Sequence, residues 1–400
     1  MLRKWIILTT YAHNLTGESA MAIHAPLVTG SWICCVPRLI IAPQAFLKPM
    51  RPSSFKLPVN PDAVAVGIFS GNVKLHLNYF PNIIHDMEML PPNTVHRIRI
   101  QRANLPDRDR SSDALPPPTA KLLGPVGILP ALGVVLAAGL LILAIVQNDG
   151  AAVVALVLLS ITSSLTGIGS LWKLQLQKRP ASKRVIPMSD VLIRNTKGTF
   201  LVVHCDEAVA RELYFTQEIC YYRLEYKIFR ICSGLATFAH MAGVIFLANC
   251  TWILQAAIGL AYIILNGSYW FGAVLPPQLA WNLEIFDVFW HADIDPATQL
   301  RINPRKKEPK SYTECLWEVA KITETMRWAK LSGTGIVPAT QAWDEWVEKA
   351  EQNCVSNPDW EFAKALSECL KKYENDGKPH LVSGQTELME PEPPAGGSGK

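Results

Sequence analysis

The sequence has little charge for its length. Only 18% of its 400 residues are charged and its mean hydropathy is +0.15, whereas about 25% of the residues of a soluble domain are charged. The charge is also balanced, because 38 Lys and Arg residues oppose 34 Asp and Glu residues and give a formal net charge of +4. Nucleic-acid binding needs a concentrated basic face, so we expect no nucleic-acid partner.

Motifs that mark catalysis or nucleotide binding are missing. The chain contains no G-x-S-x-G, HExxH, Walker A or GxGxxG pattern. Its nine cysteines show no CxxC or CxxH spacing and therefore predict neither a disulfide framework nor a zinc site. We interpret them as free thiols in a reducing compartment. The sequence thus predicts no cofactor and favours a non-catalytic protein over an enzyme.

Four long stretches contain no Asp, Glu, Lys or Arg. They cover residues 122–147, 151–172, 231–248 and 252–274. About 20 apolar residues suffice to cross ~30 Å of hydrocarbon, and a soluble helix would need a polar face that these stretches lack. The sequence therefore predicts an α-helical membrane protein with two transmembrane helical hairpins, four spans in all, whose turns lie at 148–150 and 249–251.

The basic residues predict the orientation. Each of the three hydrophilic regions carries at least five Lys or Arg residues, and neither hairpin turn carries any. The positive-inside rule then places these regions and both termini in the cytoplasm of a multi-pass membrane protein embedded in the lipid bilayer. Arg3 and Lys4 followed by apolar residues resemble a signal peptide, but a cleaved secretory signal would place the basic segment 97–121 on the wrong side.

The hydrophilic regions show strand and helix patterns. Segments 64–69, 73–79, 95–101, 191–194 and 199–204 have strand character. Because two-stranded pieces alone are marginal, we expect one small cytoplasmic α+β unit, with a helix at 207–215 covering the sheet. Helical spacing also predicts three C-terminal helices. Their outer faces are acidic and would be repelled by anionic lipid, so we expect them to pack on the sheet or to bind a protein partner.

These patterns divide the chain into seven segments. They are a poorly ordered or targeting segment at 1–59, a β-rich segment at 60–120, the first hairpin at 121–173, a strand-helix segment at 174–230, the second hairpin at 231–276, a helical region at 277–374 and a disordered tail at 375–400.

Three strings of the sequence resemble a known family. They are VLIRNTKGTFLVVHCDEAVARELYF at 191–215, ANCTWILQAAIGLAYIILNGSYWFGAVLP at 248–276 and YTECLWEVAKITETMRW at 312–328. Over roughly residues 60–370 the chain resembles an uncharacterised family of integral membrane proteins of filamentous fungi. The resemblance implies four spans, cytoplasmic termini and a fungal source, but no activity and no functional residues. The first fifty residues do not match that family.

Polar residues inside the spans are the first candidates for a site. His240 is the one ionisable side chain well inside a predicted span, and such residues are often functional. Antiparallel pairing within the second hairpin places it opposite Tyr262, so a hydrogen bond between them would satisfy it structurally; the alternative is proton or ligand handling. Gln255 and Asn266 suit polar contacts between helices, worth roughly 0.6 kcal/mol each, or the same ligand.

A second candidate follows the last span. His291, Asp293 and Asp295 alternate, so an extended backbone would place an imidazole and two carboxylates on one face for a divalent cation. Asp295 and the following proline suit a turn or helix cap equally well. His204 and Cys205 are neighbours in a predicted strand and point to opposite faces, which excludes a nucleophile–base pair.

Three hypotheses of function follow. The first is a non-catalytic, membrane-anchored interaction or scaffold protein. The second is an oligomeric channel or small-solute transporter, because four apolar helices need a symmetric homo-oligomer around His240, Gln255 or Asn266 to line a pore. The third is a membrane-interface enzyme that uses His291, Asp293 and Asp295.

Overall fold

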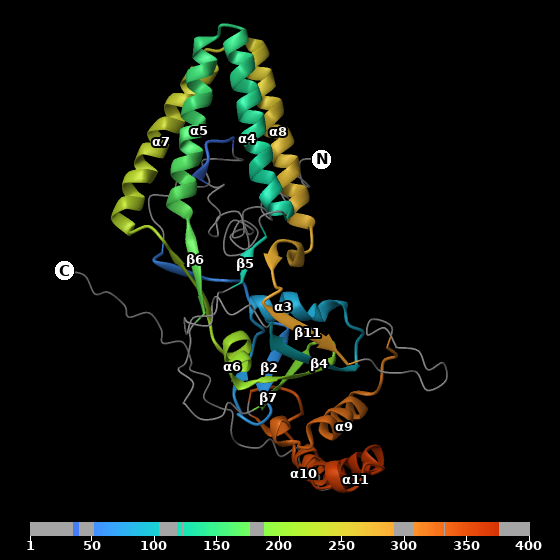
Figure 1. Ribbon diagram of the computed structural model, residues 1–400. Coiled ribbons are helices and arrows are strands. Elements are labelled where there is room, and N and C mark those ends of the chain that lie inside the picture. The colour runs from blue at the N-terminus through green and yellow to red at the C-terminus, as the bar shows by residue number, and fades with distance from the viewer. Residues whose placement is uncertain are drawn as a thin grey trace, which may run out of the picture.

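The computed structural model describes residues 35–39, 52–103, 118–121, 124–176, 188–291, 307–331 and 333–375. Two helical hairpins form its upper part in Figure 1: α4 (Pro125–Val146) with α5 (Gly150–Ser170), and α7 (Tyr226–Ala248) with α8 (Trp252–Val274). Three helical stretches, Gly127–Val146, Gly150–Ser170 and Tyr226–Ala248, are long and apolar enough to cross a membrane. The chain is therefore compatible with a multi-pass membrane protein.

Large apolar side chains cover the outside of these helices. Val135, Phe238 and Ile263, on three different helices, are 67%, 75% and 70% exposed. Soluble proteins rarely expose apolar patches of more than a few hundred Å². The outer surface of the helices is thus suited to lipid.

Each helix packs mainly against a helix of the other hairpin. Helix α5 packs along α7 and α4 packs along α8, so α7 and α8 lie on opposite sides of the bundle (Figure 1). Small residues permit the close approach of α5 and α7, because a Cβ atom on Gly243 would lie 3.2 Å from Leu159 Cγ. At the tip, the Asp149 carboxylate accepts hydrogen bonds from the amides of Ala152 (3.0 Å) and Thr251 (2.7 Å), which links the two turns.

Each helix pair continues into a pair of antiparallel strands. Stalk A consists of α4, α8, β5 (Thr119–Ala120) and β10 (Trp281–Asn282). Stalk B consists of α5, α7, β6 (Trp172–Leu176) and β9 (Glu218–Tyr222), with β1 (Ser54–Lys56) along its edge. The stalks diverge from the common tip (Figure 1). Residues 35–39 lie between them, where the Leu39 amide donates to the Gly133 carbonyl (3.3 Å).

A six-stranded sheet lies at the wide end of the stalks. Its order is β11-β4-β8-β7-β2-β3, and only β4 and β8 run parallel. The strands are β2 (Ala63–Gly67), β3 (Val73–Lys74), β4 (Val95–Arg102), β7 (Met188–Asn195), β8 (Phe200–Asp206) and β11 (Phe286–Trp290). The structure confirms that strands from both sides of the first hairpin share one sheet. Strand β3 is shorter than predicted, and β11 was not predicted.

Helices cover both faces of the sheet. The face toward the stalks carries α3 (Tyr79–His85), α6 (Glu207–Val209) and the π-helical turn η5 (Ala210–Phe215). The opposite face carries α9 (Tyr312–Thr323), α10 (Gln341–Ser356) and α11 (Phe362–Asn375). Short 3₁₀ turns are η3 (Met87–Met89), η6 (Pro277–Leu279) and η8 (Arg327–Lys330). The three predicted C-terminal helices are confirmed; α9 packs on the sheet, and α10 and α11 pack on α9.

Candidate functional site

The pairing predicted for His240 is wrong. His240 lies among the buried residues of α7, the helix that packs along α5, and its Nδ1 atom is buried without a hydrogen-bond partner. Tyr262 lies on α8 and packs into the core formed with α4 and α5. Because α7 packs against α5 and α8 packs against α4, a His240–Tyr262 hydrogen bond does not occur in the described structure.

The other candidates from the sequence do not converge on a site. Gln255 donates to the carbonyls of Ala248 (3.1 Å) and Cys250 (2.9 Å) at the hairpin turn, and Asn266 donates to the carbonyl of Tyr262 one helical turn earlier (2.8 Å). Gln255 of α8 therefore contacts the last residue of α7, as predicted, whereas Asn266 bonds within its own helix, so the contact between helices predicted for Asn266 is wrong.

The metal candidate is only partly described. His291 is exposed, and its amide donates to the Arg97 carbonyl (2.9 Å), while Asp293 and Asp295 lie outside the described residues. Among the residues that the structure describes, no group of three His, Cys, Asp or Glu side chains is arranged to hold a metal ion. His204 pairs with Asp190 (3.0 Å), and Cys205 is buried and donates to the Ser189 carbonyl.

The structure instead gathers buried polar side chains around α3. The Glu218 carboxylate accepts hydrogen bonds from the amides of Tyr79 (2.9 Å) and Phe80 (3.2 Å), the first two residues of this helix. Asn78 donates to the carbonyls of Leu213 (2.6 Å) and Thr216 (2.8 Å). Lys74 donates to Asn78 Oδ1 (2.5 Å) and to the Thr216 carbonyl (3.0 Å). We call this cluster, with Trp281, the α3 junction.

Electrostatics single out Glu218 within the α3 junction. The side chain is 5% exposed, and burial raises the pKa of its carboxyl to about 7, although the amides of Phe80 and Tyr79 and the charge of Lys74 oppose this rise. Burial likewise lowers the pKa of Lys74. Glu218 therefore changes its charge near neutral pH, at the point where stalk B meets α3.

Stalk A reaches the same helix from the other side. The Trp281 indole packs edge-on against Phe80 (5.1 Å between ring centroids) and donates from Nε1 to the Tyr79 hydroxyl (3.3 Å). Gln278 donates to the Ile83 carbonyl (3.2 Å). Because Glu218 and Trp281 both contact α3, the α3 junction connects the two stalks.

The last residue of α3 forms a second buried pair. His85 Nε2 lies 2.8 Å from the Tyr214 hydroxyl, and the two rings are stacked. Burial lowers the pKa of His85 to about 3 and raises that of Tyr214. Both side chains therefore remain neutral at physiological pH and serve as a fixed attachment of α3 to η5.

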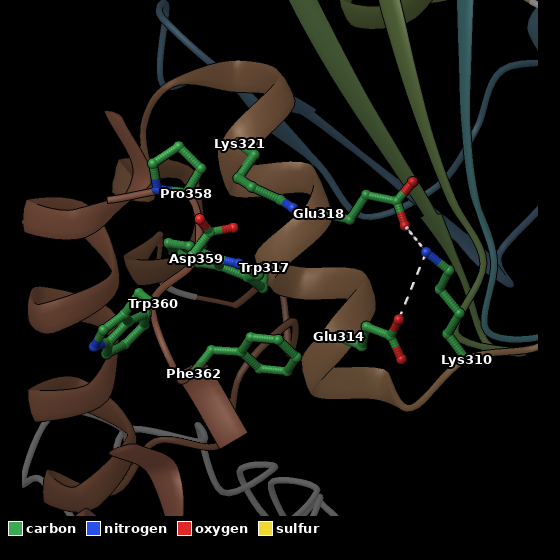
Figure 2. Close-up of a pocket in the computed structure, with 9 residues that line it drawn as sticks. All are labelled: Lys310, Glu314, Trp317, Glu318, Lys321, Pro358, Asp359, Trp360 and Phe362. Atoms are coloured by element: carbon green, nitrogen blue, oxygen red, sulfur yellow. Dashed lines mark hydrogen bonds and ion pairs between the residues drawn. The ribbon is translucent and has the colours of Figure 1, made fainter. Parts of the chain in front are cut away.

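An open groove lies on the C-terminal helices, on the side of the sheet away from the stalks. Its volume is about 410 Å³. Figure 2 shows the aromatic side chains Trp360 and Phe362 on one side and Lys310 with its two carboxylate partners on the other. The lining residues, which define the C-terminal groove, are Lys310, Glu314, Trp317, Glu318, Lys321, Pro358, Asp359, Trp360 and Phe362.

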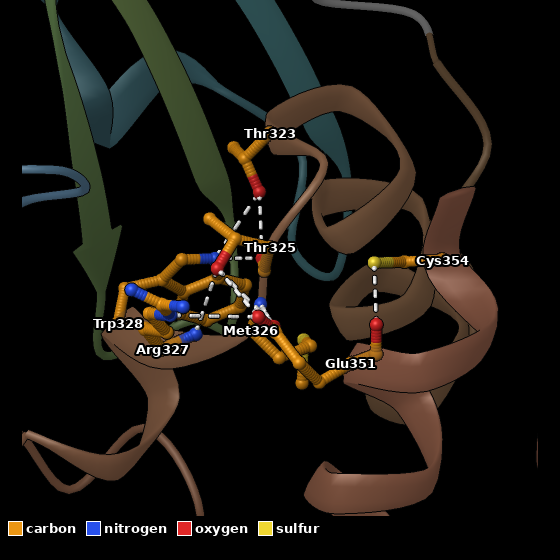
Figure 3. Close-up of polar contacts among 7 residues, drawn as sticks. All are labelled: Thr323, Thr325, Met326, Arg327, Trp328, Glu351 and Cys354. Carbon is orange, nitrogen blue, oxygen red and sulfur yellow. Dashed lines mark hydrogen bonds and ion pairs between the residues drawn. The ribbon is translucent and has the colours of Figure 1, made fainter. Parts of the chain in front are cut away.

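Polar contacts hold the helices around the C-terminal groove in place. Glu351 of α10 accepts hydrogen bonds from the Met326 amide and from Thr325 Oγ1 (3.1 Å), as Figure 3 shows. The Trp328 indole donates to the Thr325 carbonyl (2.7 Å) and to Thr323 Oγ1 (3.2 Å). These bonds fix the end of α9 and η8 against α10.

Comparisons of the chain with protein-family models, with curated proteins and with solved structures find no match.

Proposed function

We propose that this protein is a non-catalytic membrane-anchored interaction protein with four spans. Its α+β domain would lie in the cytoplasm and bind a protein partner. The observation that carries this proposal is that every described strand and every amphipathic helix lies on one side of the helical hairpins, whereas two short turns form the opposite end (Figure 1). The distribution of Lys and Arg along the sequence supports a cytoplasmic domain and cytoplasmic termini.

The C-terminal groove is the proposed contact surface. Trp360, Phe362 and Pro358 offer apolar and aromatic surface, and Lys321 and Asp359 are exposed and form no ion pair among the described residues. Protein interfaces combine such aromatic anchors with a polar rim. The chemistry therefore suits a peptide segment with an apolar anchor flanked by charges of both signs.

A charge-reversal experiment tests this assignment. In Lys321→Glu/Asp359→Lys the charges of the groove are exchanged without touching its aromatic base. We expect proteins that crosslink to the wild-type groove in native membranes to be lost from this variant. The matched control is Lys330→Glu/Glu348→Lys, which exchanges an exposed ion pair elsewhere on the same helices. If both variants retain the same crosslinked partners, the groove is not the contact surface.

Other results would favour the transporter alternative. Solute or ion flux through reconstituted protein, lost on His240→Ala, would replace the interaction protein with an oligomeric channel or transporter. The resemblance of three sequence strings to filamentous-fungal membrane proteins supports, as a proposal, membership of that family. It adds no activity to either hypothesis.

A further inference from the structure

Unpaired basic residues gather at the base of stalk B. All five are exposed, and none forms an ion pair with a described residue. By contrast, Lys310, Lys349 and Lys372 on the C-terminal helices each pair with a carboxylate. The five residues, which we call the stalk B patch, are Lys56, Lys173, Arg223, Lys227 and Arg230.

The strand register places part of this patch on one face. Lys56 lies opposite Ile219 and Lys173 opposite Tyr221, so the two lysines flank β9 on the same side of the sheet. Arg223 follows Tyr221 by two residues, and its amide continues the ladder by donating to the Leu171 carbonyl (2.8 Å). Two strand spacings and an offset of two residues along the strands separate the backbones of the flanking lysines by roughly 12 Å.

The opposite face of the same three strands, which includes Glu218, is buried. Trp172 and Cys220 are buried in the core beneath the stalks, and Phe55 packs against them. This face is turned toward the protein. The stalk B patch therefore faces outward and is accessible.

The start of α7 fixes the depth of the patch. This helix has 23 residues, a length of about 34 Å, which exceeds a hydrocarbon thickness of ~30 Å. Its first five residues, which include Lys227 and Arg230, consequently lie at the level of the lipid headgroups. Ile231, next to Arg230, is 64% exposed, and the exposed rings of Tyr221 and Tyr226 suit the same interface.

The basic charge is concentrated on one stalk. At the base of stalk A, Lys121 is the single described basic residue, whereas the five of stalk B are accompanied by one exposed acid, Glu225. The positive-inside rule by itself requires only basic residues on the cytoplasmic side and does not require them on one stalk. We propose that the stalk B patch binds the headgroups of anionic phospholipids in the membrane that the helices span.

Lipid titration of the purified full chain in neutral detergent tests this proposal. Native mass spectrometry would compare short-chain phosphatidylserine with phosphatidylcholine of the same acyl chains. We expect phosphatidylserine to bind more tightly to the wild type. Each Lys or Arg near an anionic surface contributes ~1 kcal/mol, or about fivefold in affinity. We therefore expect at least a tenfold loss of affinity for phosphatidylserine, and no change of affinity for phosphatidylcholine, in the variant Lys173→Ala/Arg223→Ala/Lys227→Ala/Arg230→Ala.

Matched variants keep the test decisive. The control Lys330→Ala/Lys349→Ala/Lys364→Ala/Lys372→Ala removes the same charge from the C-terminal helices and should bind lipid as the wild type does. The single variants Lys227→Ala and Arg230→Ala change exposed side chains only, and each should lose about fivefold in affinity for phosphatidylserine. They test the proposal even if the quadruple variant does not fold. No preference for phosphatidylserine in the wild type, or equal losses in patch and control variants, would overturn the proposal.

Discussion

Glu218 makes the stability of the fold depend on pH near neutrality. The pKa of its carboxyl is about 7 in the folded protein, against an ordinary value of 4.5. Between these values the folded protein binds the proton more tightly than the unfolded chain does, so stability falls as pH rises. The contribution of the Glu218 carboxyl to the free energy of unfolding is fully present below about pH 4.5 and is lost as pH rises through 7. The difference between the two pKa values corresponds to about 3 kcal/mol.

Replacement by glutamine should abolish this pH dependence. Glu218→Gln offers one acceptor to two backbone donors, the amides of Tyr79 and Phe80, so the variant should be less stable than the wild type at pH 5.5. The stability of the variant should then change little up to pH 8. The difference in unfolding free energy between variant and wild type should therefore become smaller as pH rises. Thermal unfolding in neutral detergent and hydrogen exchange of the α3 amides measure this.

A surface glutamate provides the control. Hydrogen bonds from Lys372 and Lys349 lower the pKa of Glu345 to about 2, well below the tested range. Glu345→Gln should therefore keep the pH dependence of the wild type. If the difference in unfolding free energy between wild type and Glu218→Gln is the same at pH 5.5 and pH 8, the reasoning is refuted.

Three further substitutions test the packing of the stalks, each by thermal or denaturant unfolding in detergent. Trp281→Ala removes a fully buried indole from the α3 junction and should cost about 3–5 kcal/mol. Asp149→Ala removes the carboxylate that links the two turns, which should lower the unfolding midpoint and speed hydrogen exchange of the Thr251 amide. Gly243→Leu places a side chain against Leu159, between α5 and α7, and should cost about 1–3 kcal/mol. An unchanged unfolding midpoint would contradict the corresponding contact.

The helical hairpins were predictable from the sequence, but the contacts between them were not. Uninterrupted apolar runs and the short turns at 148–150 and 249–251 define α4, α5, α7 and α8 closely. Local pattern favours packing of helices that follow each other in the chain. Packing of α5 on α7 depends on small residues such as Gly243, which faces Leu159 of the other hairpin. The local sequence pattern does not reveal which helix a small residue will face.

The α3 junction was missed for a related reason. Glu218 is an isolated acid at the start of a short strand, a position that ordinarily suggests a solvated side chain. Its role depends on the amides at the start of α3, about 140 residues earlier in the chain. Strand β11 was not predicted because it has only five residues, one of them Asp287. Its alternation of apolar and polar residues is too short to distinguish a strand from a loop.

The sheet also constrains how the protein is made. Its strands come from before the first hairpin (β2, β3 and β4), from between the hairpins (β7 and β8) and from after the second (β11). Until β7 and β8 have been synthesised, the early strands have unpaired edges, which attract other chains. If both hairpins span a membrane as proposed, their turns must lie on the same side before β11 can pair with β4. Completion of the sheet would then depend on correct insertion of both hairpins, and a chain with one hairpin inverted would leave strand edges unpaired.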